Sequence, residues 1–157
     1  MSNIRIFVSH RIDIDSETVD TPVYFPVRCG AVYDEEGNSE IQGDDTGDNI
    51  SKLRMSFCEF TVQYWAWKNV DADYYGLCHY RRYLSFSDKH YKNTAFNMVR
   101  ELRLTAHEKK KYHLDDTKKI NSVVQKYDMI IPVVAKASEM SYNRAEVETL
   151  REMWESY

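Results

Sequence analysis

Residues 74–83 read YYGLCHYRRY, a short apolar run that ends in one histidine and two arginines set between tyrosines. The tyrosines, leucine and cysteine of this run predict a strand covered on both faces, as in a parallel sheet. Open α/β sheets bind ligands beyond the carboxyl ends of their strands, so Arg81 and Arg82 are expected at a ligand crevice. Guanidinium groups bind phosphate or carboxylate oxygens through paired hydrogen bonds. The stretch therefore predicts an anion site, and the alternative is an arginine pair on the surface after a core strand.

The composition indicates a folded protein of single-domain size. A length of 157 residues suits one domain over 1–157, and 43% hydrophobic residues with twelve tyrosines argue against disorder. The net charge of -4 gives the chain no overall basic field, which argues against general binding of nucleic acid. The sequence has no leader-like apolar segment at its start and no run of about 18 apolar residues, so we expect no membrane span and a cytoplasmic location.

Strand-like and helix-like segments alternate along the chain. The predicted strands are 4–8, 27–33, 74–83 and 127–134, and the predicted helices follow Asp48–Asn49, cover 93–112, follow Asp115–Asp116 and cover 142–157. Residues 12–26, with two prolines, are expected to be irregular. This order is typical of an α/β protein with a parallel sheet.

The helix after Asn49 is expected to lie in the centre of the fold. Five apolar residues at a spacing of three or four are predicted to face the core: Leu53, Phe57, Phe60, Tyr64 and Trp67. Val62 and Trp65 belong to a second apolar stripe. Because a helix that is apolar over most of its circumference is normally buried, Trp65 and Trp67 are interpreted as core residues and not as ligand platforms.

Two acidic motifs offer alternative readings. Asp71-Ala72-Asp73 precedes its strand, so we expect it at the sheet edge opposite the ligand, as a polar turn. The loop GDDTGDNIS at 43–51 places carboxylates, glycines and a helix start together, and is as compatible with a capped helix entrance as with a binding loop. His10 and His79 each stand where the apolar run of a predicted strand ends, and a histidine there can serve as proton donor or hydrogen-bond partner.

Three blocks in this order resemble a bacterial family. They are GDDTGDNIS at 43–51, CEFT with YWAWKN at 58–69, and GLCHYRRY at 76–83. Together they resemble the capsular and exopolysaccharide glycosyltransferases long catalogued as a domain of unknown function. IFVSH at 6–10 and YDMIIP at 127–132 look like the first and a later strand of that family. The resemblance covers residues 4 to 132, whereas 133–157 look unlike the family.

The resemblance implies a GT-A-like fold, with a Rossmann-like, mostly parallel sheet flanked by helices, and a domain incomplete at its C-terminus. It implies a hexosyltransferase-type enzyme that moves a sugar from a nucleotide-diphosphate donor to a growing capsular polysaccharide, exopolysaccharide or surface glycan, with a lipid-linked acceptor as one form. The alternatives are a catalytically inactive, truncated module that binds sugar nucleotides or another protein, and a phosphate-binding regulatory protein.

The resemblance also implies a donor site. The residues expected at the diphosphate are His79, Tyr80, Arg81 and Arg82, and those expected at the nucleoside are Ser9, His10, Asp48 and Asn49. The arginines would neutralise the leaving group, and from that role we infer that they could partly substitute for a metal. No catalytic residue and no metal ligand is assigned; Asp44 and Asp45 are the candidates if a divalent cation, manganese or magnesium, takes part. We also expect that the protein forms a homodimer and that it lies at the inner face of the cell membrane as a peripheral protein.

Overall fold

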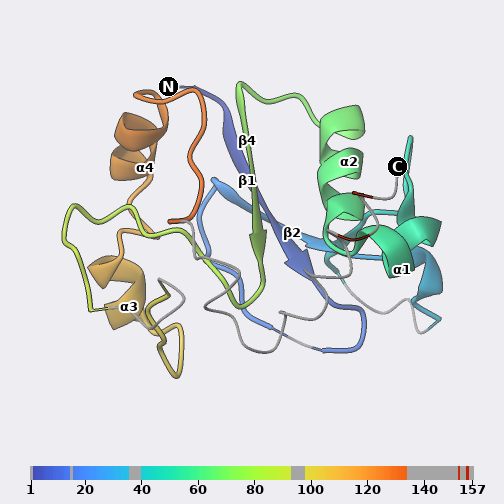
Figure 1. Ribbon diagram of the computed structural model, residues 1–157, viewed down its shortest axis with the longest axis horizontal. Helices are drawn as coiled ribbons and strands as arrows, with labels where there is room; N and C mark the ends of the chain where they lie inside the picture. Colours follow the sequence, from blue (N-terminus) through green and yellow to red (C-terminus); the bar gives the residue numbers. More distant parts are fainter. Residues whose placement is uncertain are drawn as a thin grey trace. The chain divides into compact units, whose positions relative to one another are not determined.

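A parallel sheet of four strands is the centre of this computed structural model, which describes residues 2–14, 16–35, 40–92, 98–133, 152 and 155. The strands are β1 (Ile4–His10), β2 (Tyr24–Arg28), β3 (Gln42–Gly43) and β4 (Tyr74–His79), in the order β3-β2-β1-β4. Every neighbouring pair is parallel. The arrowheads of β1 and β4 point to the same edge of the sheet, which we call the carboxyl edge (Figure 1). The predicted α/β fold with a parallel sheet is confirmed.

The chain divides into two compact units. The first comprises Met1–Ser87 and Leu104–Met129, and the second comprises Asp88–Arg103 and Ile130–Tyr157. All four strands and the helices α1 to α4 belong to the first unit. That the two units form one domain stays a prediction.

The strand order reverses direction between β1 and β4. From β1 the chain moves outward to β2 and then β3, and it returns to the other side of β1 with β4. Such a reversal is the place where open α/β sheets bind ligands. We call this place the switch point; it lies at the carboxyl ends of β1 and β4, at His10 and His79.

The second strand begins earlier than the sequence predicts. It covers Tyr24–Arg28, and the chain then forms the short 3-10 helix η1 (Ala31–Tyr33). The amide of Cys29 donates to the carbonyl of His10 at 2.8 Å, so by alternation position 26 faces away from β1. Because β3 begins only opposite Val27, the missing N–H of Pro26 costs no ladder bond. The predicted irregular segment 12–26 is therefore wrong over its last three residues, which belong to β2. The predicted strand 27–33 is wrong after Arg28, where β2 ends.

The predicted central helix is three elements. They are η2 (Ser51–Leu53), α1 (Arg54–Phe57) and α2 (Phe60–Asn69), and the break falls at Cys58, which has a φ of 47°. Val62, Trp65 and Ala66 of α2 pack against the strand residues Phe7 and Val27. Trp65 is thus a core residue, as predicted.

The predicted core-facing stripe is wrong. Leu53, Phe57, Phe60 and Trp67 have exposed fractions between 47% and 63%. The break at Cys58 interrupts the helical phase, so the spacing before it does not continue into α2. Trp67 is therefore a surface residue.

The helices α3 (Ala106–Lys111) and α4 (Thr117–Val124) lie on the other side of β1 and β4 from α1 and α2 (Figure 1). Thr105 and Glu108 form a capping box at α3, and Asp116 caps α4 by accepting from the amide of Lys119 at 2.9 Å. Ile120 is the fully buried residue of α4. The predicted helix after Asp116 is confirmed.

Two further predictions are wrong over the residues that the structure describes. Of the predicted helix 93–112, the described part is helical only over Ala106–Lys111. Residues 127–133 form no strand, and Tyr127 and Met129 are exposed. β-forming side chains alone do not make a strand, because strand formation depends on pairing and packing. The predicted helix 142–157 lies outside the described residues, apart from two positions. Where the chain is described, every helix is too short or too polar to cross a membrane.

Candidate functional site

The turn that follows β4 is fixed by backbone hydrogen bonds at the switch point. The amide of Tyr80 donates to the carbonyl of Ser9 at 3.1 Å, and the amide of Arg82 donates to the carbonyl of His79 at 2.9 Å. The amide of Arg81 donates to Nδ1 of His79 at 3.2 Å. These bonds hold both arginines just beyond the carboxyl edge, where their side chains are exposed.

Tyr80 is the packing centre of this turn. Its buried ring lies 4.2 Å from the His79 ring and 6.3 Å from the His10 ring, between centroids. The guanidinium carbon of Arg81 lies 4.9 Å from the centroid of the same ring, a cation–π contact. Among the residues that the structure describes, neither Arg81 nor Arg82 forms an ion pair. Two positive charges are therefore available to an anion here.

The surroundings of His79 lower the pKa of its ring. Burial lowers its pKa; the carboxylate of Glu59 opposes this, and the charges of Arg82, Arg81 and Arg11 add to the lowering. Because Nδ1 accepts from the amide of Arg81, the hydrogen-bond pattern assigns the ring proton to Nε2, which lies 3.5 Å from Oε1 of Glu59. Glu59 directly precedes α2, so this helix and β4 meet at the site.

Ser9 and His10 end β1 beside this turn, and both are buried. Nδ1 of His10 lies 2.6 Å from Oγ of Ser16, and Nε2 lies 2.6 Å from Oγ1 of Thr18. Burial lowers the pKa of His10, and the charge of His79 adds to this effect. The structure thus places Ser9 and His10 next to His79 and Tyr80 but covers His10 with residues 16–18. Their contact with a nucleoside stays a prediction, which requires this cover to move.

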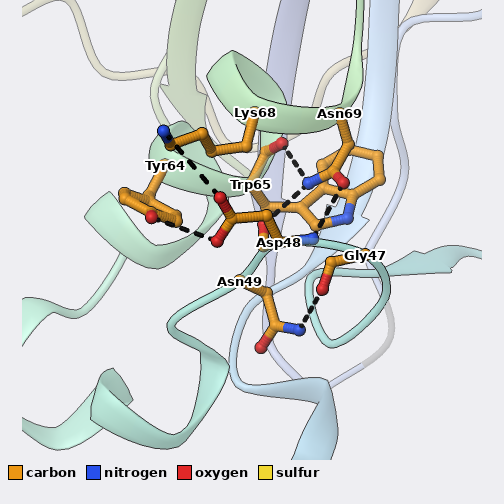
Figure 2. Close-up of polar contacts among 7 residues, drawn as sticks. All are labelled: Gly47, Asp48, Asn49, Tyr64, Trp65, Lys68 and Asn69. Atoms are coloured by element: carbon orange, nitrogen blue, oxygen red, sulfur yellow. Dashed lines mark hydrogen bonds and ion pairs between the residues drawn. The ribbon is translucent and has the colours of Figure 1, made fainter.

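The backbone of Asp48 is hydrogen-bonded to the last turn of α2 (Figure 2). Its amide donates to Oδ1 of Asn69 at 3.0 Å, and its carbonyl accepts from Nδ2 of Asn69 at 2.8 Å. Its carboxylate accepts from the hydroxyl of Tyr64 at 3.1 Å and lies 3.8 Å from Nζ of Lys68. The side-chain amide of Asn49 donates to the carbonyl of Gly47 at 3.0 Å, within the same loop.

The predicted nucleoside group is therefore divided. α2 begins next to Glu59, which contacts His79, and ends at Asn69, which holds Asp48. Ten helical residues separate these ends, a rise of about 15 Å. The structure brings His79, Tyr80, Arg81 and Arg82 together with Ser9 and His10, but it does not bring Asp48 and Asn49 to them. The described contacts of this loop are within the fold, because Asn69 holds Asp48 and Oδ1 of Asn49 accepts from the amide of Ser51 at 3.2 Å. The predicted cap is wrong: the N-cap of η2 is Ile50, and no side chain caps it.

Asp44 does not fit a metal ligand. It is fully buried, and its two oxygens accept four hydrogen bonds from protein groups. The donors are the amides of Gly30 and Ala31, both at 2.9 Å, and the hydroxyls of Ser51 and Thr61, both at 2.6 Å. The neighbouring carboxylate of Asp45 is exposed, and the described part of the chain contains no cluster of three metal-ligating side chains. We assign no step to a metal at these residues, and metal dependence stays a prediction.

The predicted position of the other acidic motif is confirmed. Oδ2 of Asp73 accepts from the amide of Asn3 at 2.7 Å, and the carbonyl of Asp71 accepts from the side chain of Asn3 at 2.8 Å. These contacts lie at the amino ends of β1 and β4, opposite the switch point.

Two charged residues of the site were not assigned a role from the sequence. Glu59 faces His79 because α2 begins beside β4, which only the packing reveals. Arg11 directly follows β1, and its position after a predicted strand was the one signal that sequence reasoning had for it.

Comparisons with known proteins agree with this architecture. The family described as "Domain of unknown function (DUF4422)" matches residues 5–154. The apo structure of the bifunctional glycosyltransferase WbbM is similar, with a TM-score of 0.69 and 32% sequence identity over 78% of this chain. The match covers 21% of the WbbM chain, so this chain spans about a fifth of that protein. No curated protein matches. The chain shares a glycosyltransferase-like fold with WbbM and belongs to the family catalogued as domain of unknown function DUF4422.

Proposed function

We propose that this chain binds a nucleotide-diphosphate sugar at the switch point and, as a glycosyltransferase domain, transfers the sugar to a growing surface polysaccharide. The observation that carries the proposal is the pair of guanidinium groups, Arg81 and Arg82, which stand without an ion-pair partner among the described residues beside the end of β1. The similarity to the glycosyltransferase WbbM supports it. The capsular or exopolysaccharide role rests on the sequence motifs.

The chemistry of sugar transfer suits this arrangement. When the bond between the sugar and the diphosphate breaks, negative charge develops on the leaving diphosphate. Cations fixed in advance stabilise that charge more than they stabilise the ground state, and this difference accelerates the reaction. The contact of Arg81 with the Tyr80 ring and the backbone bonds of the turn reduce the freedom that the guanidinium must lose on binding.

The nucleoside lies next to the diphosphate in such a donor. Ser9 and His10 end β1 beside the turn: Ser9 pairs with His79, and the ring of His10 lies 6.3 Å from the ring of Tyr80. We propose that the segment over His10, which includes Ser16 and Thr18, moves when the nucleoside binds. The acceptor is a glycan, lipid-linked or free, and it is not assigned to residues.

A second candidate is a module that binds the sugar nucleotide without turning it over. One observation is compatible with this candidate: the described histidines and Glu59 contact one another or hydroxyl groups. Release of free nucleoside diphosphate in the presence of a glycan acceptor distinguishes the enzyme from the module.

The first experiment is calorimetric titration with a panel of nucleotide-diphosphate sugars, with and without manganese. The variant Arg81→Ala/Arg82→Ala is expected to bind at least about a hundredfold more weakly, because hydrogen bonds to charged groups contribute about 1.5–3 kcal/mol each. The variant Lys109→Ala/Lys110→Ala, which removes two adjacent positive charges on α3, is the matched control and should bind as the wild type does. Equal affinity of wild type and the arginine variant would overturn the proposed site.

A further inference from the structure

We propose that Arg11 is a third anion-binding residue at the switch point, and that Asp13 occupies its guanidinium group until a diphosphate displaces it. This inference rests on the proposed function of the site. Arg11 is the first residue after β1 and is exposed. Its Nε donates to Oδ1 of Asp13 at 2.7 Å, and its Nη2 forms an ion pair with Oδ2 of the same carboxylate.

Arg11 belongs to the same electrostatic neighbourhood as the two arginines after β4. Its charge acts on the His79 ring together with the charges of Arg81 and Arg82. Asp13 is the main cause that raises the pKa of Arg11, and the hydroxyl of Tyr80 adds to it. Tyr80 thus interacts with both arginines: its hydroxyl acts on Arg11, and its ring contacts Arg81. The amide of Tyr80 donates to the carbonyl of Ser9 at 3.1 Å, two residues before Arg11 in the chain.

The bound carboxylate resembles the ligand that we propose for the site. A carboxylate offers a guanidinium group two oxygens in the same plane, and a phosphate group offers the same geometry. Asp13 therefore satisfies Arg11 in the free chain as a phosphate would in the complex. If it leaves, three guanidinium groups face the ligand in place of two.

Displacement of Asp13 is energetically modest. Both side chains of the pair are about half exposed, 45% for Arg11 and 52% for Asp13. Exposed ion pairs change an equilibrium constant by less than about fivefold. Asp13 is two residues from Arg11, so a rotation of its side chain frees the guanidinium without a change in the sheet. A third cation favours ligands with two phosphate groups over ligands with one, because a diphosphate carries more negative charge and more acceptor oxygens than a monophosphate.

The test is calorimetric titration of the full chain with nucleoside diphosphates, the matching monophosphates and inorganic pyrophosphate. Asp13→Asn is expected to bind the diphosphates about two- to fivefold more tightly, since it removes the competing charge. Arg11→Ala is expected to bind them about tenfold more weakly and to lose preference for diphosphate over monophosphate. Arg11→Lys, which retains the charge without the paired geometry, should lie between wild type and Arg11→Ala.

Two controls separate this effect from net charge. Asp20→Asn makes the same charge change at an exposed position of the same connection, and Arg5→Ala removes an arginine near the amino end of β1. Both should bind as the wild type does. Equal tightening by Asp20→Asn and Asp13→Asn would overturn the inference.

The outcomes also distinguish the inference from the proposed function. Wild-type binding of diphosphates that neither Asp13→Asn nor Arg11→Ala changes overturns the inference and leaves the site at Arg81 and Arg82. Failure of wild type and Asp13→Asn to bind any probe overturns both. Binding by Asp13→Asn where wild type binds none supports the inference in its strongest form.

Discussion

The carboxylate of Asp44 accepts a hydrogen bond of 2.6 Å from the hydroxyl of Thr61, across 17 positions of the sequence, and both side chains are fully buried. Asp44 follows β3 and Thr61 lies in the first turn of α2. A second contact joins the same two segments, because Nε1 of Trp65 donates to Oγ1 of Thr46 at 3.0 Å. The motifs GDDTGDNIS and CEFT with YWAWKN are therefore two halves of one structural unit.

Replacement of Asp44 by asparagine is expected to destabilise the fold by about 3 kcal/mol. The amide nitrogen of asparagine would face N–H or O–H donors that the carboxylate now satisfies, and a buried donor without an acceptor is costly. Urea unfolding followed by circular dichroism measures the change. Asp45→Asn, at the exposed neighbouring position, is the control and should change the free energy of unfolding by less than about 0.5 kcal/mol. Equal unfolding midpoints for the two variants would refute the structural role of Asp44.

The contact between Gly47 and Asn69 yields a prediction of coupling. Gly47 has a φ of 57°, and a Cβ atom built there would lie 2.0 Å from Oδ1 of Asn69. Gly47→Ala is therefore expected to cost more than the roughly 1–2 kcal/mol of a left-handed alanine. In the background of Asn69→Ala the clash is absent, so the double variant should be about 1 kcal/mol more stable than the sum of the single changes predicts. A double-mutant cycle by urea unfolding measures this; strict additivity would show that the side chains do not meet.

Much of the arrangement of the sheet could be predicted from local sequence. The alternation of strand and helix gave a parallel sheet, and the position of YYGLCHYRRY within it placed His79 and Arg81 at the carboxyl edge. The same argument placed Asp71-Ala72-Asp73 at the amino edge. These predictions depend only on strand direction, which a parallel sheet fixes for every strand at once.

The phase of a helix and the pairing of a strand could not be predicted in this way. A single residue with positive φ, Cys58, resets the face that α2 presents to the sheet. Pro26 is tolerated in β2 because β3 is short and does not reach the position opposite Pro26. The length of β3 is set by residues about 16 positions further along the chain, so the sequence around Pro26 does not reveal it. The separation of Asp48 from His10 follows from its bonds to Asn69, at the far end of α2.

The corrected orientation of α2 can be tested by mutation of its two faces. Val62 is fully buried against the sheet, whereas Phe60 is 62% exposed. Val62→Ala is expected to lower the free energy of unfolding by about 2 kcal/mol, through lost burial and a residual cavity. Phe60→Ala should change it by less than about 0.5 kcal/mol, because alanine is the better helix former and little burial is lost. Chemical denaturation of both variants is the measurement, and the reverse ranking would restore the orientation expected from the sequence.

Acidification is expected to destabilise the fold through His10 and His79. Burial is the main cause that lowers the pKa of each ring below the ordinary value of 6.5. Between the folded pKa and 6.5, the unfolded chain therefore binds more protons than the folded chain. The stabilisation is fully present above the unfolded pKa and is lost as the pH falls through the folded pKa.

Unfolding free energies at pH 7.5 and pH 5.5 test this dependence, with the variants His10→Gln and His107→Gln measured in parallel. His107 is exposed on α3, so its variant should keep the pH dependence of the wild type. His10→Gln should lose part of it, because glutamine does not titrate and its amide can still bond to the hydroxyl of Thr18. The same loss in both variants would mean that burial of His10 does not govern the response. Binding of a diphosphate should oppose the effect at His79, since an anion beside the ring favours its charged form.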